Sequence, residues 1–319
     1  MKEYYPAYYP GFQCIAGACR HSCCIGWEID IDEDTAAYYS AVSGAMGERL
    51  RENVAFGETA SFRLVEGERC PFLNRDNLCE VILTLGEESL CEICAEHPRF
   101  HNFYSDRIES GVGLCCEAAA ALILRQTAPF VLLHTGRKPR GAEQPAYLPL
   151  RDRLLELLSD RRKPLRDRCG EAAALCGTEL PERSPSEWAE LFLSLEQLAP
   201  EWTQQLQQLT AQGDTLALAE YARYAAEYET EYENLLCYFV YRHFLNMAED
   251  FSFGPGAALG FALVSCGMIV LLHAQHWTRT GGIDPDTRAE IARQYSAEIE
   301  YSDENPARIV TLLAREGGI

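Results

Sequence analysis

The sequence predicts a mainly α-helical protein in which an irregular, cysteine-rich N-terminal part with short strands is followed by a helical bundle. Ten of the fourteen cysteines fall within the first 116 residues, where Gly, Asn and Asp separate short segments. Residues 185–319 carry apolar side chains at helical spacing instead. The 319 residues suffice for one large or two ordinary domains. We expect a Cys-rich domain over 1–124, a connecting segment over 125–184 and a helical domain over 185–319.

The overall composition is that of a globular protein, with one deviation in charge. Hydrophobic residues make up 47% of the chain and charged residues 24%, which excludes low-complexity and collagen-like classes. The 48 acidic side chains outnumber the 28 basic ones, so the net charge is -20. Such a field repels nucleic-acid phosphates and anionic lipids and attracts cations. We therefore expect no nucleic-acid partner.

Short elements are expected in the first part of the chain. Asp34 is placed to cap a helix over residues 35–52, whose apolar residues lie near helical spacing. Residues 62–64 alternate between apolar and polar side chains, which favours a short strand. An Asn- and Asp-rich loop separates Cys70 from Cys79, so that both can face one site.

Two further helices are expected before the composition changes. The first covers residues 87–96 and ends before Pro98. It places Cys91 and Cys94 on one face, because residues three apart are neighbours on a helix. The second covers residues 117–125 and follows the last of the ten N-terminal cysteines.

The connecting segment is basic and interrupted by prolines. Between Arg125 and Arg168, 11 Arg or Lys side chains stand against 5 Asp or Glu. This composition favours a solvated linker, and a basic patch for an acidic partner or a cofactor phosphate is the alternative.

The last part of the sequence is predicted to be almost entirely helical. A helix begins at Ser186, and residues 215–251 contain neither Pro nor Gly. Asp284-Pro285 and Asn305-Pro306 each pair an N-cap residue with proline at the first helical position, and Gly317 is expected to end the last helix.

One uncharged stretch needs a test for membrane insertion. Residues 257–274 are long enough to approach the lower limit for crossing a bilayer. The stretch contains Gly260, Ser265, Gly267 and His273 and lacks a basic cluster on either side. We expect a buried bundle helix and no membrane span.

The cysteines of the first part are expected to bind metal. The N-terminus MKEYYPAYYPGF has no apolar signal region, so we expect a cytoplasmic protein with reduced thiols. Reduced cysteines at short spacings are typical of metal ligands, and residues 1–124 are therefore interpreted as a metal-cluster domain. Four of them lie within eleven residues, at Cys14, Cys19, Cys23 and Cys24. The adjacent pair is expected to face different directions, so that one thiol is structural or the two serve two metals.

In this order, the motifs resemble those of the flagellin lysine-N-methylase family, within the wider CxxCxxCC zinc- or iron-chelating superfamily. The resemblance rests on CxxxxCxxxCCxxWxIxID at residues 14–32, CPFLNRDNLCEV at 70–81, LGEESLCEICAEHPR at 85–99 and GLCCEAA at 113–119. A further match begins at ENLL, residues 233–236. Three positions depart from the family pattern, where Tyr, Pro and Ile are more usual: His97, Cys116 and Val81.

The resemblance implies methyl transfer from S-adenosylmethionine to lysine side chains of flagellin, with a Cys-ligated iron-sulfur cluster of the 4Fe-4S type. Zinc is the alternative metal. The family's ligand positions correspond to eight thiols and leave Cys91 and Cys116 as extra cysteines. The eight are Cys14, Cys19, Cys23, Cys24, Cys70, Cys79, Cys94 and Cys115.

Five side chains near these cysteines are candidates for the chemistry. A lysine ammonium has a pKa near ~10.4 and must lose its proton before it attacks a methyl group. Asp30, Asp32 and Glu117 are candidates to accept that proton, although solvated strand or turn residues, for the two Asp, and a helix cap, for Glu117, are the ordinary roles. Trp27 is a candidate for holding a cationic donor by cation-π contact, or a core residue. Arg99 is a candidate for binding a carboxylate of the donor, or a structural ion-pair partner.

Two other functions remain open at this stage. The first is a non-catalytic zinc- or iron-binding module whose cysteines staple an irregular fold that holds a protein partner. The second is electron transfer by the cluster. Binding of S-adenosylmethionine distinguishes the methyltransferase from both.

Overall fold

The chain forms two compact units in the computed structural model, which describes residues 2–137, 143–179, 182–249 and 253–316. Unit 1 comprises residues 1–12, 101–115 and 119–319, and unit 2 comprises residues 13–100 and 116–118. Helices dominate, and the strands are few and short, so the predicted mainly α fold class is confirmed. The boundaries expected at residues 124 and 184 do not coincide with those of the two units.

Unit 2 is a small α+β unit built from short elements. Its sheet has the antiparallel order β2-β4-β3, with Asp30 paired to Ser61 and Val54 paired to Phe62. The elements are β2 (Asp30–Ile31), α1 (Glu33–Ala41), α2 (Gly44–Asn53), β3 (Val54–Ala55), β4 (Ala60–Phe62), α3 (Glu80–Leu85) and α4 (Glu92–Glu96), with 3-10 turns at Ala16–Ala18 and Glu87–Ser89.

The helix expected over residues 35–52 is instead two helices. Asp32, not Asp34, caps α1 by accepting a hydrogen bond from the backbone N–H of Thr35 at 2.9 Å. The chain leaves the helical conformation at Val42 and Ser43, whose ψ angles are 129° and 166°, and α2 begins at Gly44, which has a φ of 75°. The helix expected over residues 87–96 is likewise split into a 3-10 turn and α4.

The core of unit 2 combines apolar side chains with thiols. Ile29, Tyr39, Leu50, Phe72 and Val81 are at most 2% exposed. The same cluster includes two cysteines, and three more pack against it: Cys70 and Cys91, then Cys24, Cys79 and Cys94.

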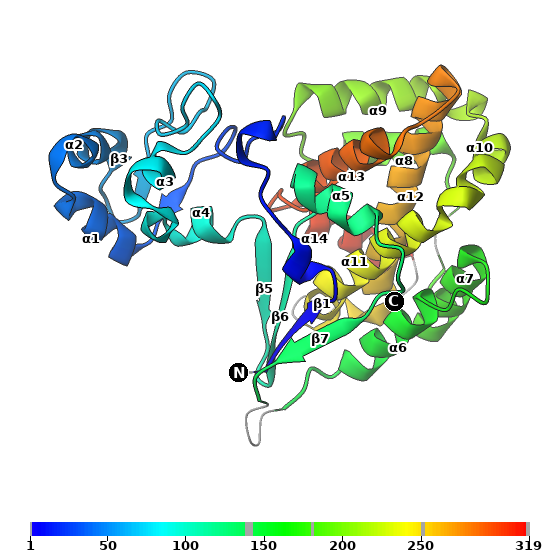
Figure 1. Ribbon diagram of the computed structural model, residues 1–319. Coiled ribbons are helices and arrows are strands. Elements are labelled where there is room, and N and C mark those ends of the chain that lie inside the picture. Colours follow the sequence, from blue (N-terminus) through cyan, green and yellow to red (C-terminus); the bar gives the residue numbers. More distant parts are fainter. Residues whose placement is uncertain (1, 138–142, 180–181, 250–252, 317–319) are drawn as a thin grey trace. The chain divides into compact units, whose positions relative to one another are not determined.

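Unit 1 combines a small sheet with a helical bundle (Figure 1). The sheet order is β5-β6-β1-β7, in which β1 runs parallel to β6 and antiparallel to β7. Its strands are β1 (Lys2–Pro6), β5 (Arg99–Phe103), β6 (Arg107–Val112) and β7 (Leu132–Thr135). The chain passes from unit 2 into unit 1 along β5.

The helices that follow are α5 (Glu117–Leu124), α6 (Leu148–Leu158), α7 (Leu165–Cys176), α8 (Pro185–Leu193), α9 (Pro200–Gln212), α10 (Leu218–Ala225), α11 (Glu229–Glu249), α12 (Gly254–Thr280), α13 (Pro285–Ile299) and α14 (Asn305–Glu316). The expected cap at Asp284 is present, because its carboxylate accepts from the N–H groups of Asp286 and Thr287. Ser184 caps α8 in a capping box, two residues earlier than the start expected at Ser186. Gly317, expected to end the last helix, lies outside the described residues.

The two long helices α11 and α12 pack against each other at the centre of unit 1. The uncharged stretch 257–274 lies in α12, where an 18-residue window has a mean hydropathy of 2.1 and is 83% buried inside the structure. By length and composition α12 is the one helix among the described residues that suffices to cross a membrane. Its buried environment is that of a core helix.

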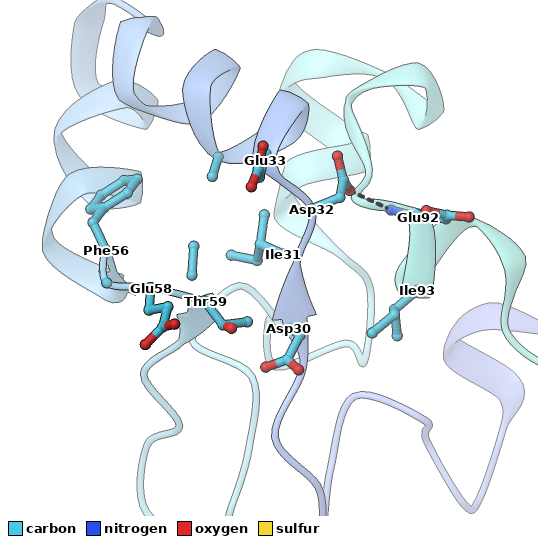
Figure 2. Close-up of a pocket in the computed structure, with 12 residues that line it drawn as sticks. Asp30, Ile31, Asp32, Glu33, Phe56, Glu58, Thr59, Glu92 and Ile93 are labelled. Carbon is cyan, nitrogen blue, oxygen red and sulfur yellow. Dashed lines mark hydrogen bonds between the residues drawn. The ribbon is translucent and has the colours of Figure 1, made fainter.

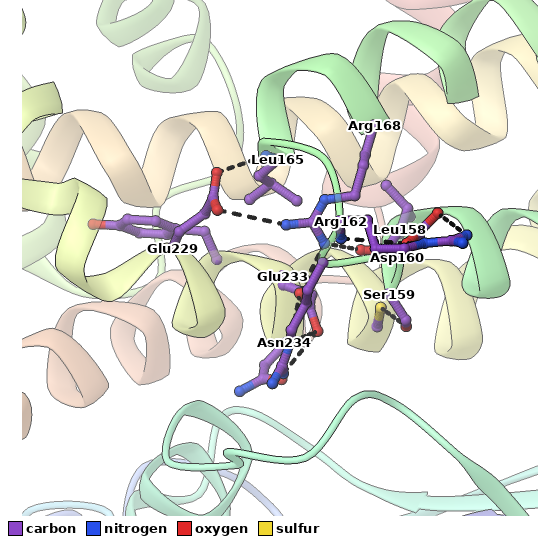
Figure 3. Close-up of polar contacts among 12 residues, drawn as sticks. Leu158, Ser159, Asp160, Arg162, Leu165, Arg168, Glu229, Glu233 and Asn234 are labelled. Atoms are coloured by element: carbon purple, nitrogen blue, oxygen red, sulfur yellow. Dashed lines mark hydrogen bonds and ion pairs between the residues drawn. The ribbon is translucent and has the colours of Figure 1, made fainter.

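The basic connecting segment is not a solvated linker where it forms α6 and α7. Leu154 and Leu158 of α6 are fully buried. Arg151 donates to both oxygens of Glu109 at 2.7 and 2.6 Å, and both side chains are 0% exposed. Arg168 of α7 donates to Glu233 of α11 at 2.7 Å (Figure 3). The arginines that indicate a linker in the sequence therefore neutralise buried glutamates.

Candidate functional site

Five cysteines of unit 2 gather in its core, and we call them the inner thiols: Cys24, Cys70, Cys79, Cys91 and Cys94. The backbone N–H of Cys70 donates to the carbonyl of Cys24 at 2.8 Å, which joins the first Cys-rich loop to the second. A bridge between Leu73 and Cys79 closes that second loop. Cys91 stands at the N-cap of α4 and Cys94 lies one turn further along.

The inner thiols are close enough to change one another's protonation. Burial, reinforced by the thiols of Cys24, Cys79 and Cys91, raises the pKa of Cys70 to about 12. The pKa of Cys79 is raised by burial as well. A hydrogen bond from Cys94 lowers the pKa of Cys91, and the same bond raises that of Cys94. A hydrogen bond from Cys23 likewise lowers the pKa of Cys24, to about 7, so the inner thiols differ from one another in their ease of ionisation.

A second group of thiols in unit 2 lies nearer the solvent, and we call it the outer thiols: Cys14, Cys19, Cys23 and Cys116. A hydrogen bond with Cys24 and burial are the main causes that raise the pKa of Cys23, and the negative charges of Cys14 and Cys116 raise it further. The pKa of Cys19 is raised to about 11 by burial and, further, by Glu117 and Cys116. The sulfur of Cys14 accepts from the N–H of Ala16 at 3.4 Å.

The adjacent residues Cys115 and Cys116 lie on either side of a boundary between the two units. Cys115 belongs to unit 1, where its thiol is hydrogen-bonded to Tyr301. Its neighbour Cys116 belongs to unit 2 and interacts with Cys19 and Cys23. Seven of the eight predicted ligands thus lie in unit 2 together with Cys91 and Cys116. The eight-cysteine ligand set stays a prediction.

The thiols are suitable metal ligands by their chemistry, but they are not arranged around a common metal position. In the described part of the chain, no three His, Cys, Asp or Glu side chains form a group ready to hold a metal ion. Thiolate sulfur is the preferred ligand of zinc and of iron-sulfur clusters, so the donor set fits such a group. Metal binding removes the thiol protons that now form the Cys23–Cys24 and Cys91–Cys94 hydrogen bonds.

Unit 2 also contains an acidic pocket of about 500 Å³. Figure 2 shows its carboxylates arranged around β2 and the loop before β4. Its lining includes five acidic residues and no basic one, and one aromatic side chain, Phe56, which is 47% exposed. The acidic residues are Asp30, Asp32, Glu33, Glu58 and Glu92. The pocket is suited to a positively charged ligand with an apolar stem.

Two of these acids have different surroundings. Asp32 accepts hydrogen bonds from the N–H groups of Thr35 and Glu92, each at 2.9 Å. Although burial raises the pKa of Asp32, these bonds outweigh it and leave the pKa below its ordinary value. Asp30 is exposed, and among the described residues its side chain makes no hydrogen bond or ion pair. Asp30 is therefore the better placed of the two to meet a ligand.

The other predicted residues lie elsewhere in unit 2. Glu117 accepts from the backbone N–H of Arg20 at 2.9 Å and from its guanidinium at 2.8 Å, so it does not line the pocket. Trp27 donates to the carbonyl of Cys23 at 2.6 Å, and its ring lies 5.6 Å from that of His97. Arg99 donates to the carbonyl of Ala95 at 3.4 Å. These contacts fit structural roles, and the proposed roles in catalysis and donor binding stay predictions.

Sequence reasoning missed the other members of the pocket. Phe56 and Glu58 come from the loop before β4, and Glu33 and Glu92 from the first turns of α1 and α4. For Glu33 and Glu92 the only signal in the sequence is an acidic side chain near a helix start, which is also an ordinary way to stabilise a helix.

Comparison with known proteins places the chain in a family. The profile described as "FliB lysine N-methylase C-terminal domain" matches residues 182–318. The lysine-N-methylase of Salmonella typhimurium is 27% identical over 161 residues, which are 48% of this chain and 40% of the relative. The flagellar biosynthetic protein FliU of Salmonella muenchen is 30% identical over 136 residues, which are 40% of this chain and 79% of FliU. No solved structure matches.

The match therefore spans less than half the length of the Salmonella typhimurium enzyme, and most of FliU. The matched profile falls in the helical bundle of unit 1 and covers α8 to α14. On these grounds, the chain belongs to the FliB-like lysine-N-methylase family.

Proposed function

We propose that this protein is a lysine N-methyltransferase that transfers methyl groups from S-adenosylmethionine to lysine side chains of flagellin in the cytoplasm. The observation that carries the proposal is the membership of the chain in a family whose named relatives are lysine-N-methylases. The acidic pocket of unit 2 supports it, because a lysine side chain has the charge and the apolar stem that the pocket suits.

The reaction requires a proton acceptor beside the lysine. A bond forms between the lysine nitrogen and the methyl carbon, the carbon–sulfur bond of the sulfonium breaks, and its electron pair stays on sulfur. The ammonium must first lose a proton, and the positive sulfonium favours this loss by repulsion. The carboxylate of Asp30 attracts the ammonium to the pocket and is the acceptor that we propose for the proton.

The N-terminal cysteines are proposed to hold an iron-sulfur cluster, with zinc as the alternative. The fit rests on their donor chemistry, since nine thiols gather within unit 2. The N-terminal cysteines would hold the cluster, which would supply an iron able to bind the methyl donor. Trp27 and Arg99 are kept as proposed contacts of the donor.

The test is methyl transfer by the full chain purified without oxygen. Flagellin and S-adenosylmethionine carrying a labelled methyl group are the substrates, and mass spectrometry locates methylated lysines. We expect Asp30→Asn to lower the rate by roughly 10²-fold or more, as for loss of a general base. Asp34→Asn is the matched control, because Asp34 is an exposed acid on α1 outside the pocket. No methylation by metal-loaded protein would refute the proposal.

The burial of the inner thiols favours one alternative, a non-catalytic metal-binding module that holds a protein partner. A metal in the core of unit 2 would stabilise the fold without taking part in catalysis. Calorimetric titration with S-adenosylmethionine separates the two functions. The module predicts no binding of the donor, whereas the methyltransferase predicts saturable binding.

A further inference from the structure

We propose that the outer edge of β7 in unit 1 binds an extended, lysine-bearing segment of the protein substrate by strand addition. In this binding mode the segment extends the sheet and is held mainly by hydrogen bonds between backbones. The edge shares no residue with the acidic pocket of unit 2. The identity of the bound chain rests on the proposed function, whereas the binding mode rests on the geometry of β7.

The position of β7 leaves one of its sides open. It is the last strand in the order β5-β6-β1-β7 and pairs with β1 on its inner side (Figure 1). The backbone N–H of Ala7 donates to the carbonyl of Val131 at 2.9 Å. Because hydrogen-bonded pairs alternate along an antiparallel ladder, the groups of Leu133 also point toward β1. The N–H and C=O groups of Leu132 and His134 therefore point outward, where the described residues place no strand.

The side chains of β7 are accessible as well. Val131 is 51% exposed and Leu133 is 43% exposed, and His134 and Thr135 are also exposed. Edge strands are commonly protected from pairing by a lysine, a proline or a bulge. β7 contains neither lysine nor proline, and its register with β1 continues without a bulge. The strand is therefore a template on which another extended chain can pair.

The chemistry of the edge and the charge of the protein define the occupant. Only an extended polypeptide matches outward N–H and C=O groups that repeat every second residue. The net charge of -20 attracts a chain that carries lysines and repels a second copy of this protein. Backbone bonds do not depend on the bound sequence, so one edge accepts segments around different lysines.

β5, at the opposite edge of the sheet, offers less of its length to another chain. Of its five residues only Phe103 is exposed, and the other four are half-buried. Tyr104 and Arg107 exchange backbone hydrogen bonds at 2.9 and 3.4 Å, so the N–H of Phe103 points to the outer edge. Phe103 is thus the counterpart of His134 for a control substitution.

The first experiment is hydrogen exchange of the full chain, followed by mass spectrometry. The probe is a peptide of alternating valine and lysine, about ten residues long. Strand addition should slow exchange within residues 131–135, because the outward N–H groups acquire acceptors. A peptide of alternating valine and glutamate is the charge control and should protect β7 less. Unchanged exchange of residues 131–135 at saturating valine–lysine peptide would overturn the proposal.

The second experiment replaces His134 by Pro, which removes one outward N–H and leaves the bonds to β1 in place. Edge strands tolerate proline at such positions. The affinity, measured by titrating the protection of β7, should fall by roughly tenfold or more. This readout is specific to β7 and is unaffected by peptide bound in the acidic pocket. Phe103→Pro is the matched control and should retain the affinity of the unaltered protein.

A variant with Val131→Lys and Leu133→Lys tests the same edge if His134→Pro does not fold. Both side chains already face solvent, and lysines on an edge oppose pairing, so this variant should also lose the protection. Equal affinities of the His134→Pro and Phe103→Pro variants would contradict the proposal. A dimer of the unaltered protein that His134→Pro converts to a monomer would replace the substrate segment by a second copy.

Methylation of flagellin separates this inference from the proposed function. His134→Pro should raise KM for flagellin and leave kcat nearly unchanged, because the edge binds the substrate and takes no part in methyl transfer. Methyl transfer with an unaltered KM would overturn the docking inference alone. Protection of β7 by the peptide without any methyl transfer would support strand addition and contradict the proposed function.

Discussion

Replacing Glu233 by Gln should unfold unit 1 at a clearly lower temperature. Glu233 is 1% exposed and pairs with two guanidinium groups, of which Figure 3 labels that of Arg168. Arg168 donates to it at 2.7 Å, and Arg161 donates to both of its oxygens at 3.0 and 3.1 Å. The substitution keeps the shape of the side chain and removes the negative charge. Arg168, itself 1% exposed, then keeps only Glu229 as an acidic partner, at 3.6 Å and 42% exposed.

The magnitude follows from the burial of both charges. Breaking a buried ion pair on one side costs about 3–5 kcal/mol, because the remaining charge stays without a partner. We expect the lower end, about 3 kcal/mol, since Glu229 and the amide oxygen of Gln still interact with Arg168. For a unit of more than 200 residues, this lowers Tm by roughly 6–12 °C.

The assay is thermal unfolding followed by circular dichroism, with Glu156→Gln as the matched control. Glu156 pairs with Arg153 at 3.1 Å, but these side chains are 69% and 62% exposed. Solvent screening limits that pair to about 0.5 kcal/mol or less. Equal Tm shifts in the two variants would refute the reasoning, because burial would then have no influence on how much an ion pair contributes to stability.

Three further predictions concern pH, capping and salt. Burial lowers the pKa of His273 to about 3, so on acidification the unfolded chain takes up a proton that the folded chain excludes. The free energy of unfolding should therefore be unchanged above pH ~6.5 and fall by up to about 1.4 kcal/mol per pH unit below it. Urea unfolding at pH 7.5 and 5.0 checks this, and a His273→Gln variant with the same acid sensitivity would contradict it. Asp32→Ala should destabilise unit 2 by about 1–2 kcal/mol, because the N-cap of α1 is lost. Asp32→Asn should nearly preserve the stability, since the amide oxygen can still accept the capping hydrogen bond. Equal stability of the two variants by calorimetry would argue against the cap. A lysine-rich peptide should bind the pocket more weakly at 500 than at 50 mM salt by roughly a factor of ten, measured by fluorescence anisotropy, and Glu58→Gln should reduce both the affinity and its salt dependence.

Local signals in the sequence predicted many elements of the fold. The cap at Asp284 and the uncharged, apolar character of α12 are properties of short segments, so they can be read without knowledge of the tertiary structure. The Cys-rich part was recognisable in the same way.

Most of the features that were not predicted from the sequence depend on contacts between residues far apart in the chain. The break between α1 and α2 is an exception, because Ser43-Gly44 is a local turn signal that the helical spacing of the apolar residues on both sides masked. The basic segment has its partners far along the chain, since Arg151 and Arg168 bind Glu109 and Glu233. Cys115 and Cys116 are adjacent in the sequence, and only the path of the chain separates their surroundings. The pocket, likewise, is assembled from three separate segments, residues 30–36, 56–60 and 92–93.

The order in which the chain visits the two units has a consequence for folding. Residues 13–100 of unit 2 are inserted between β1 and the remainder of β5, and both strands belong to one sheet of unit 1. Once that sheet has formed, the ends of the insertion are held a fixed distance apart, two strand spacings or about 10 Å. An unfolded insertion then behaves as a closed loop whose entropy is already reduced, much as if a cross-link joined its ends. A folded unit 1 thus lowers the entropic cost of folding unit 2, because the insertion is tethered at both ends.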